Sequence, residues 1–173
     1  MAVLLLCGCG QKSETAAATP AQAVTAAAAQ SSTARPVSTG VTPEQFGAKG
    51  DGIADDLQAL QAAMQQASAS GRPLELTAGA VYRFSSCLGL PSGLTIRGNG
   101  AVLLSDIQYP DLKEDRVAVE LMKDSDDDRA HDVRLENVTF RAADSCQANY
   151  MLRVMLARNV EFVGCTFDCE PNE

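Results

Sequence analysis

Carboxylate side chains gather in one short run of the sequence, Asp124-Ser125-Asp126-Asp127-Asp128. Carboxylate oxygens are the ligands that Ca²⁺ prefers in proteins. The run is therefore a candidate calcium or carbohydrate contact, formed by Asp124, Asp126, Asp127 and Asp128. It lacks the spacing and the glycine of an EF-hand loop, and it lies between two apolar runs where a solvated loop is expected. The solvated loop is the alternative interpretation, and the sequence predicts no catalytic residue.

Thiols are the second group with chemistry available to them. Four cysteines follow the first forty residues: Cys87, Cys146, Cys165 and Cys169. In an oxidising compartment they are candidates for disulfides, but four cysteines allow three pairings and the sequence does not choose among them. Cys165 and Cys169 have a spacing that could supply two of the four ligands of a zinc site, but no second pair of Cys or His completes it. His131 is the only histidine. We therefore predict no bound metal other than calcium at the aspartate run.

An apolar run, Met-Ala-Val-Leu-Leu-Leu-Cys-Gly-Cys-Gly, opens the chain. It is too short to cross a bilayer as a helix and is typical of the end of a secretion signal. Leu6-Cys7-Gly8-Cys9 is similar to the bacterial lipobox, which makes Cys9 the expected site of lipid attachment. An ordinary cleaved signal peptide is the alternative. Both interpretations predict export, either to the bacterial cell envelope on a lipid anchor or into the medium.

Composition divides the chain of 173 residues into four parts. Residues 1–9 form the signal-like segment, and residues 10–40 form a disordered linker rich in Ala, Thr and Gln, which cannot bury enough surface to order itself. Residues 41–72 form an N-terminal cap and residues 73–173 form the main body. The net charge of -8 leaves no basic stripe for nucleic acid and gives no steering toward acidic polysaccharides.

The elements that position these groups change character at Pro73. Before it, Leu57, Leu60, Met64 and Ala67 recur on one face and predict an amphipathic helix from about Asp56 to Ser68. Asp55 is the expected N-cap and Gly71 the stop. After it, short alternating runs predict strands at 74–77, 81–85, 94–97, 102–104, 117–122, 133–135, 138–140, 151–155, 160–162 and 165–167.

An internal repeat chooses among the all-β folds. Residues 131–140 align without gaps on residues 158–167, an offset of 27, and residues 94–99 form a looser third copy. In a parallel β-helix, equivalent residues of successive coils stack, so Val133 should lie beside Val160. Asn or Gly at 137, 98 and 164 should turn the corners, and Cys165 should point inward, where a buried thiol competes with a disulfide.

A family resemblance supports this fold. The segment Phe46-Gly47-Ala48-Lys49-Gly50-Asp51-Gly52-Ile53-Ala54-Asp55-Asp56, followed by a helix and then by residues 74–82, resembles the opening of the pectate-lyase superfamily, which includes polygalacturonases and phage tailspikes. Leu57 and Thr77 depart from the Thr and Pro that are usual there. The resemblance implies a right-handed parallel β-helix of about five coils under a capping helix. The structural cap that it implies consists of Phe46, Asp51, Asp55, Leu57, Leu60 and Met64.

The resemblance also implies a link to polysaccharides. The catalytic carboxylates and calcium ligands of such enzymes lie on later coils, and the polygalacturonase motifs are not found here. We expect the C-terminal end to be truncated, and its open coil to allow self-association. The leading hypothesis is an exported, lipid-anchored fragment that binds or helps to process polysaccharide without catalysing a reaction alone. The alternatives are a lyase or hydrolase of uronate-containing polymers and a noncatalytic binding or adhesion module.

Overall fold

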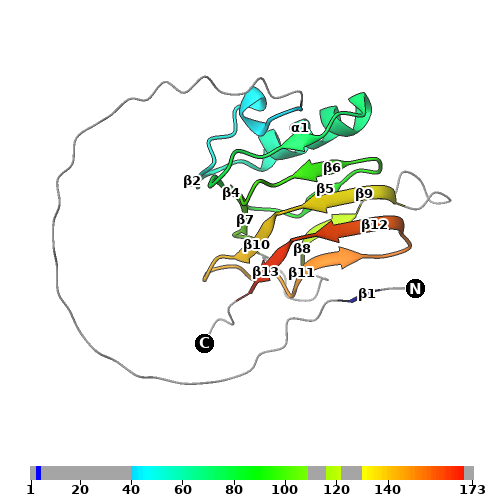
Figure 1. Cartoon of the computed structure of the whole chain (residues 1–173). Helices are drawn as coiled ribbons and strands as arrows, with labels where there is room; N and C mark the ends of the chain where they lie inside the picture. Colours follow the sequence, from blue (N-terminus) through cyan, green and yellow to red (C-terminus); the bar gives the residue numbers. More distant parts are fainter. Residues whose placement is uncertain (1–2, 5–39, 109–115, 122–129, 170–173) are drawn as a thin grey trace.

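Parallel strands stack in three sheets to form the body of the chain (Figure 1). The computed structural model describes residues 3–4, 40–108, 116–121 and 130–169. The sheets have the orders β13-β10-β7-β4-β2, β12-β9-β6-β3 and β1-β11-β8-β5, and all their pairings are parallel except that of β1 with β11. The prediction of a parallel β-helix is confirmed.

Each coil contributes one strand to each sheet in turn. Within the described residues the strands are β1 (Val3–Leu4), β2 (Asp51–Asp55), β3 (Leu74–Glu75), β4 (Val81–Phe84), β5 (Leu88–Leu90), β6 (Thr95–Arg97), β7 (Val102–Ser105), β8 (Val117–Leu121), β9 (His131–Glu136), β10 (Thr139–Ala142), β11 (Tyr150–Val154), β12 (Arg158–Val163) and β13 (Thr166–Asp168). Strands β3 to β11 make three full coils, and β12 with β13 begins a fourth. With β2 above β4, the largest sheet has five strands, in agreement with about five coils.

The 27-residue repeat corresponds to the step from one coil to the next. Val160 pairs with Val133, and Phe162 pairs with Leu135, between β12 and β9. Below the corner, the ring of Phe167 stacks on that of its repeat partner Phe140, with centroids 5.1 Å apart and planes 7° from parallel. The predicted neighbour relation between Val133 and Val160 is therefore confirmed.

Inward side chains of the stacked strands form the core. In the third coil Val133, Leu135, Val138 and Phe140 have no exposed surface, because a coil lies on each side of them. Their partners in the fourth coil belong to edge strands of their sheets, and Phe162 is accordingly 37% exposed. Burial of the core therefore depends on coil-on-coil stacking, since each coil alone leaves two faces open.

Corners between the sheets use residues with positive φ. Asn99, Asn137 and Gly164 have φ of 52°, 51° and 63°, a region that Asn and Gly adopt most readily. Gly98 lies in its predicted turn, whose Ala101 N–H bonds to the Gly98 carbonyl at 2.8 Å, but Asn99 adopts the left-handed conformation there. Gly98 has a different constraint: a Cβ there would lie 2.4 Å from the backbone oxygen of Asn137. Close approach of two coils therefore requires glycine at 98.

One helix, α1 (Leu57–Ser70), lies at the N-terminal end of the stacked sheets (Figure 1). It packs against the 3-10 helix η1 (Pro43–Phe46) and against β3 and β5. Leu60 and Met64 are fully buried and Leu57 is 8% exposed, so the predicted apolar face is turned toward the coils. Gly71 ends the helix with φ of 64°.

The aspartate that caps the N-terminus of this helix is not the one that was predicted. The N-cap is Asp56 and not Asp55, and the Asp56 carboxylate accepts hydrogen bonds from the backbone N–H groups of Lys49 and Gly50, at 2.8 and 3.0 Å. Asp55 instead accepts from the N–H of Leu57 at 3.2 Å and from the Ser85 hydroxyl. The Asp56 carboxylate therefore stabilises the glycine-rich turn, while the Asp55 carboxylate accepts from the N–H of Leu57, the first residue of the helix.

The remaining cap residues lie near the surface. Phe46 ends η1 and is 38% exposed. Asp51 is exposed, and the N–H groups of Ala54 and Ile53, which bond to its carboxylate at 2.8 and 2.9 Å, lower its pKa. Asp51 begins β2, a strand that the glycine-rich pattern did not predict. The three-residue strand β5 also went unpredicted, because Leu-Gly-Leu is too short to show a period.

A partly buried hydrogen-bond cluster joins η1 to the first coil. The Glu44 Oε1 atom accepts from the Tyr82 hydroxyl at 2.6 Å and from the Thr77 hydroxyl at 2.7 Å, and the N–H of Thr77 donates to the Tyr82 oxygen at 3.1 Å. Burial raises the pKa of Glu44, but the hydrogen bonds from Tyr82 and Thr77 outweigh it and leave the pKa below its ordinary value. Burial, and then the bond to Glu44, raise the pKa of Tyr82 to about 12. Thr77 supplies two donors that the proline usual in the resembled family lacks.

Candidate functional site

The outer face of the five-stranded sheet carries a row of five side chains, four of them charged. Cross-strand pairing places Asp55 beside Arg83, Arg83 beside Leu104, Leu104 beside Arg141, and Arg141 beside Asp168. Neighbouring strands in a sheet lie about 4.8 Å apart, so the row runs along the axis of the solenoid with one side chain from each coil. We call these five residues the charged column.

Ion pairs hold both arginines of the charged column. Arg83 Nη2 lies 2.6 Å from the Oδ2 atom of Asp106, a residue just beyond β7, and Arg141 Nε lies 2.9 Å from Asp168 Oδ2. The Ser145 hydroxyl donates to the other oxygen of Asp106. The bond from Ser145, followed by the contact with Arg83, lowers the pKa of Asp106, which is therefore ionised at neutral pH. Three successive coils are tied together by this one carboxylate.

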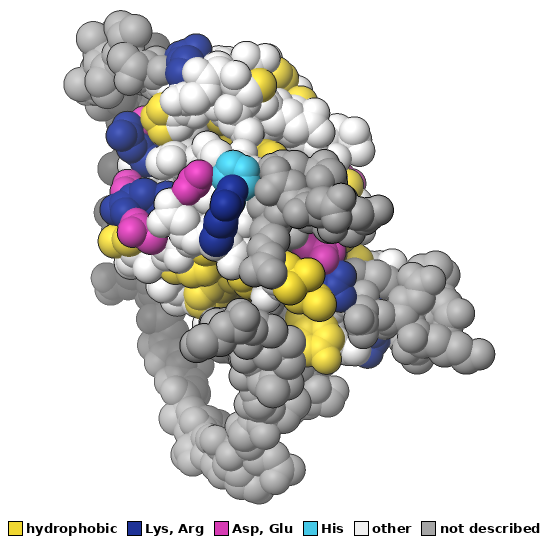
Figure 2. Space-filling model, turned by 90° about the vertical axis from the view of Figure 1, so that its right-hand side faces the viewer, with side chains coloured by type: hydrophobic (Ala, Val, Ile, Leu, Met, Phe, Trp, Pro, Cys, Tyr) yellow, Lys and Arg dark blue, Asp and Glu magenta, His cyan; other side chains and the backbone are white. Residues whose placement is uncertain are grey.

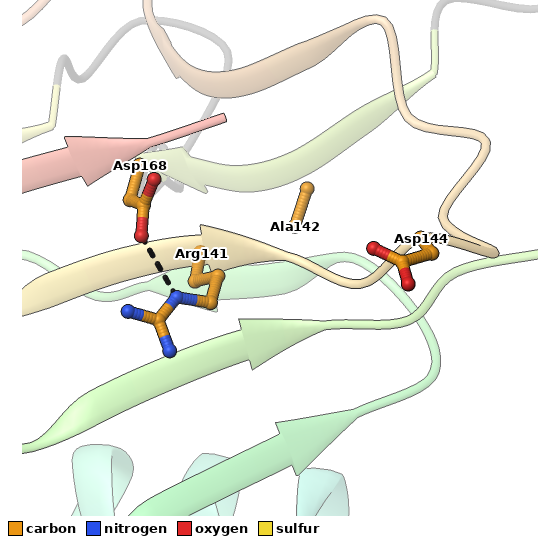
Figure 3. Close-up of a pocket in the computed structure, with 4 residues that line it drawn as sticks. All are labelled: Arg141, Ala142, Asp144 and Asp168. Atoms are coloured by element: carbon orange, nitrogen blue, oxygen red, sulfur yellow. Dashed lines mark hydrogen bonds and ion pairs between the residues drawn. The ribbon is translucent and has the colours of Figure 1, made fainter. Parts of the chain in front are cut away.

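A shallow cavity opens beside the lower end of the charged column. It has a volume of about 280 Å³ and is lined by Arg141, Ala142, Asp144 and Asp168. Figure 3 shows Arg141 and Asp168 joined by their ion pair, with Asp144 on the opposite side of Ala142. The Asp144 carboxylate and the Arg141–Asp168 ion pair therefore border one cavity.

The outer face of the β12-β9-β6-β3 sheet is also charged. Arg97 bonds to Glu75 at 2.9 Å, and Arg134 bonds to Glu136 at 2.6 Å and to Glu161. Figure 2 shows such positive and negative side chains interspersed near the single histidine. Exposed pairs of this kind contribute little to stability, and their mutual neutralisation favours a solvated surface.

The third outer face holds a thiol beside an ion pair. Arg153 Nη2 lies 2.9 Å from Glu120 Oε1, between β11 and β8. Burial, and then the negative charge of Glu120, raise the pKa of the nearby Cys87 thiol. A raised pKa leaves little thiolate at neutral pH, so this cysteine is not an activated nucleophile.

The calcium prediction and the lipid-attachment prediction fall on residues that the structure does not describe. Asp124, Asp126, Asp127 and Asp128 belong to the connection between β8 and β9, and Cys9 belongs to the N-terminal segment. Within the described ranges, no three His, Cys, Asp or Glu side chains are grouped so that they could hold a metal ion. In the same ranges, α1 is too short and too polar to span a bilayer, and no other helix is suited to do so.

The sequence left disulfides and thiols open as alternatives, and the described part of the chain contains no disulfide. Cys87, Cys146, Cys165 and Cys169 are thiols there. They lie in different environments, because Cys87 is beside the Glu120 pair while the Cys146 sulfur lies 3.2 Å from the Ser105 hydroxyl inside the core. Cys165 packs against the core beneath the Leu135 carbonyl, as the interpretation of a buried thiol predicts.

Sequence reasoning missed the charged column and the Asp106 cluster. Arg141 and Asp168 are 27 residues apart, so the repeat contained a signal for their contact. Arg83 and Asp106 are 23 residues apart, and Ser145 and Asp106 are 39 apart, so no fixed period joins them.

Comparisons with known proteins agree with the geometry of the fold. Residues 41–112 match the family model described as rhamnogalacturonase A/epimerase, pectate lyase-like. A curated relative, the capsule K30/K69-specific depolymerase 1 of Klebsiella phage K5-2, is 43% identical over 60 residues, which cover 35% of this chain and 7% of the phage protein. The chain thus spans a small part of that relative's length.

Solved structures support the same fold. PfbA, a surface adhesin of Streptococcus pneumoniae, is 19% identical with a TM-score of 0.58 over 75% of this chain and 33% of its own. ORF18 of Geobacillus virus E2 is 22% identical with a TM-score of 0.52, over 71% and 25% of the two chains. At these identities the likeness shows the fold alone. The resemblance to the pectate-lyase superfamily is confirmed, and the chain contains a pectate-lyase-like segment in a parallel β-helix.

Proposed function

We propose that this chain supplies the cap and the first coils of a β-helix that binds polysaccharide or takes part in its processing, and that contact is made through the charged column. The observation that carries this proposal is the cavity bounded by Arg141, Asp144 and Asp168 at the end of the column. The phage relative, which bears the name of a capsule-specific depolymerase, supports polysaccharide as the ligand class.

A repeating ligand suits a repeating surface. Backbone pairing fixes the column residues at regular intervals, so little side-chain ordering remains to be done when a ligand binds. Sugar hydroxyls both donate and accept hydrogen bonds, and the column offers guanidinium donors next to carboxylate acceptors. The half-buried outward side chains of Val81, Val102 and Leu104 provide apolar area beside these polar groups.

Affinity electrophoresis of the purified 173-residue chain in gels containing single polysaccharides tests the proposal. We expect retention by at least one polymer and a loss of retention in Arg141→Gln. The matched control is Arg97→Gln on another sheet, which breaks an ion pair of the same 2.9 Å length. Equal retention of both variants and the parent chain would refute the column as the contact surface.

Catalysis is tested in the same samples. The alternatives are a lyase or hydrolase of uronate-containing polymers and a noncatalytic adhesion module. We expect no new unsaturated or reducing ends when the chain is incubated with pectate or alginate. New ends that disappear on Asp126→Ala or on calcium removal would favour the enzyme and place calcium at the aspartate run.

We further propose export and lipid attachment at Cys9, which the similarity of Leu6-Cys7-Gly8-Cys9 to the lipobox supports. Expression of the chain in a bacterium fed labelled fatty acid should give a labelled envelope protein. Label retained by Cys9→Ser would refute this assignment.

Self-association through the fourth coil is a separate proposal. It is supported by the edge positions of β12 and β13 and by the partial exposure of Phe162. Sedimentation should show a concentration-dependent dimer that Phe162→Lys weakens. A monomer at every concentration would refute it.

A further inference from the structure

The charged column has too little free positive charge to bind an acidic polymer. Each of its two arginines already faces a carboxylate, Arg83 with Asp106 and Arg141 with Asp168. To bind either guanidinium, a uronate carboxylate would have to displace Asp106, at 2.6 Å from Arg83, or Asp168, at 2.9 Å from Arg141. The Asp106 partner is also fixed by Ser145, so it does not move aside freely.

Among the described residues, carboxylates outnumber cations on this face. Five acidic residues lie on it or at its edge: Asp51, Asp55, Asp106, Asp144 and Asp168. Against them stand Arg83 and Arg141, with Lys49 on the turn before β2. Charges closer than the Debye length of about 8 Å at physiological salt interact, so a polyanion lying along the column meets net repulsion.

Neutral sugar hydroxyls match the same groups without this penalty. Asp144 is exposed beside the cavity, and it can accept from a hydroxyl while the neighbouring Arg141–Asp168 pair remains intact. Thr139 and Thr166, which are neighbours in the register of β10 and β13, extend this surface with their hydroxyls. A carboxylate beside a guanidinium presents an acceptor and a donor together, which is the complement of two adjacent hydroxyls.

We propose that the charged column selects neutral, hydroxyl-rich polysaccharides over uronate polymers. This inference rests on the proposed polysaccharide function and adds the ligand class to it. On this proposal the charged column is a surface rich in hydrogen-bond acceptors. Its arginines orient the carboxylates toward the ligand and do not themselves bind anions.

The test compares native-gel affinity of the 173-residue chain for galactomannan and hydroxyethylcellulose with that for polygalacturonate and alginate, at low and at physiological salt. We expect retention by a neutral polymer that changes little with salt, and none by the acidic polymers. A double variant, Asp144→Lys with Asp168→Asn, removes the repulsion and releases Arg141. It should gain salt-sensitive retention by polygalacturonate and lose neutral-polymer affinity about two- to fivefold, the range expected for one exposed charged contact.

A control applies a similar change of charge to another face. The double variant Glu136→Lys with Glu75→Gln alters the β12-β9-β6-β3 sheet, frees Arg97, and should leave neutral-polymer retention unchanged. Circular dichroism of every variant establishes that the β-helix is intact. If the double variant on the charged column does not fold, Asp144→Asn, a substitution at an exposed residue, takes its place. Stronger retention of the parent chain by acidic polymers would overturn the proposed selectivity while sustaining the proposed function. Absence of retention by every polymer would overturn both, and loss of affinity in the control alone would overturn the site.

Discussion

Replacement of Tyr82 by Phe should weaken the attachment of the cap to the first coil. The Tyr82 side chain is fully buried, and its hydroxyl donates to Glu44 at 2.6 Å while accepting from the N–H of Thr77 at 3.1 Å. Phe fills the same space, so no cavity forms and the change removes two hydrogen bonds alone. Glu44 keeps the Thr77 hydroxyl as a donor, whereas the backbone N–H of Thr77 loses its acceptor.

The magnitude follows from the kinds of bond that are lost. A hydrogen bond to a charged group contributes about 1.5 to 3 kcal/mol and a neutral one about 1 kcal/mol, so Tyr82→Phe should lower the free energy of unfolding by about 2.5 to 4 kcal/mol. At about 4 °C per kcal/mol for a domain of this size, the melting temperature should fall by about 10 to 16 °C. Tyr150→Phe is the matched control, because no described residue bonds to the Tyr150 hydroxyl, and its effect should stay within about 0.5 kcal/mol.

The difference between the parent chain and Tyr82→Phe should depend on pH. The folded-state pKa of Glu44 lies below its ordinary value of 4.5, so its contribution to stability is fully present above that value and is lost as the pH falls through the folded pKa. Thermal unfolding followed by circular dichroism at pH 7 and at lower pH measures this. The gap in melting temperature should be widest at pH 7 and narrow in acid. A gap below about 1 °C at pH 7, or one that is the same at every pH, would refute the assigned role of the Glu44 carboxylate.

Three further results are expected. Gly98→Ala should destabilise the fold by more than about 2 kcal/mol in urea unfolding, because its Cβ would lie 2.4 Å from a backbone oxygen. The control Gly93→Ala has open space around it and should cost only about 1 kcal/mol. Equal costs would contradict the close approach of the coils. Phe140→Ala should cost about 3 to 5 kcal/mol and Phe167→Ala clearly less, since only the former is fully buried, and the reverse order would contradict the stacking of the coils. The Cys87 thiol should react with iodoacetamide at neutral pH more slowly than free cysteine, since burial raises its pKa, and a faster reaction would contradict that environment.

The sequence was sufficient for the fold because stacking is periodic. Val133 and Phe140 recur as Val160 and Phe167 after 27 residues, and the structure pairs them in that register. The amphipathic helix was also predictable, because apolar residues spaced three and four apart indicate a helix with one buried face. The short strands β2 and β5 were not, because they show no period of their own and depend on neighbouring strands for their hydrogen bonds.

The charged column, by contrast, is a product of tertiary structure. Arg83 reaches Asp106 across 23 residues and Asp106 reaches Ser145 across 39, because the connections between successive strands differ in length from coil to coil. A sequence pattern records which side chains face outward, but it does not record which of them meet when loop lengths vary. The amino-acid sequence alone therefore determined the solenoid and its cap, whereas coil-on-coil packing decided which charges pair, where the cavity opens and how little positive charge is left free for a ligand.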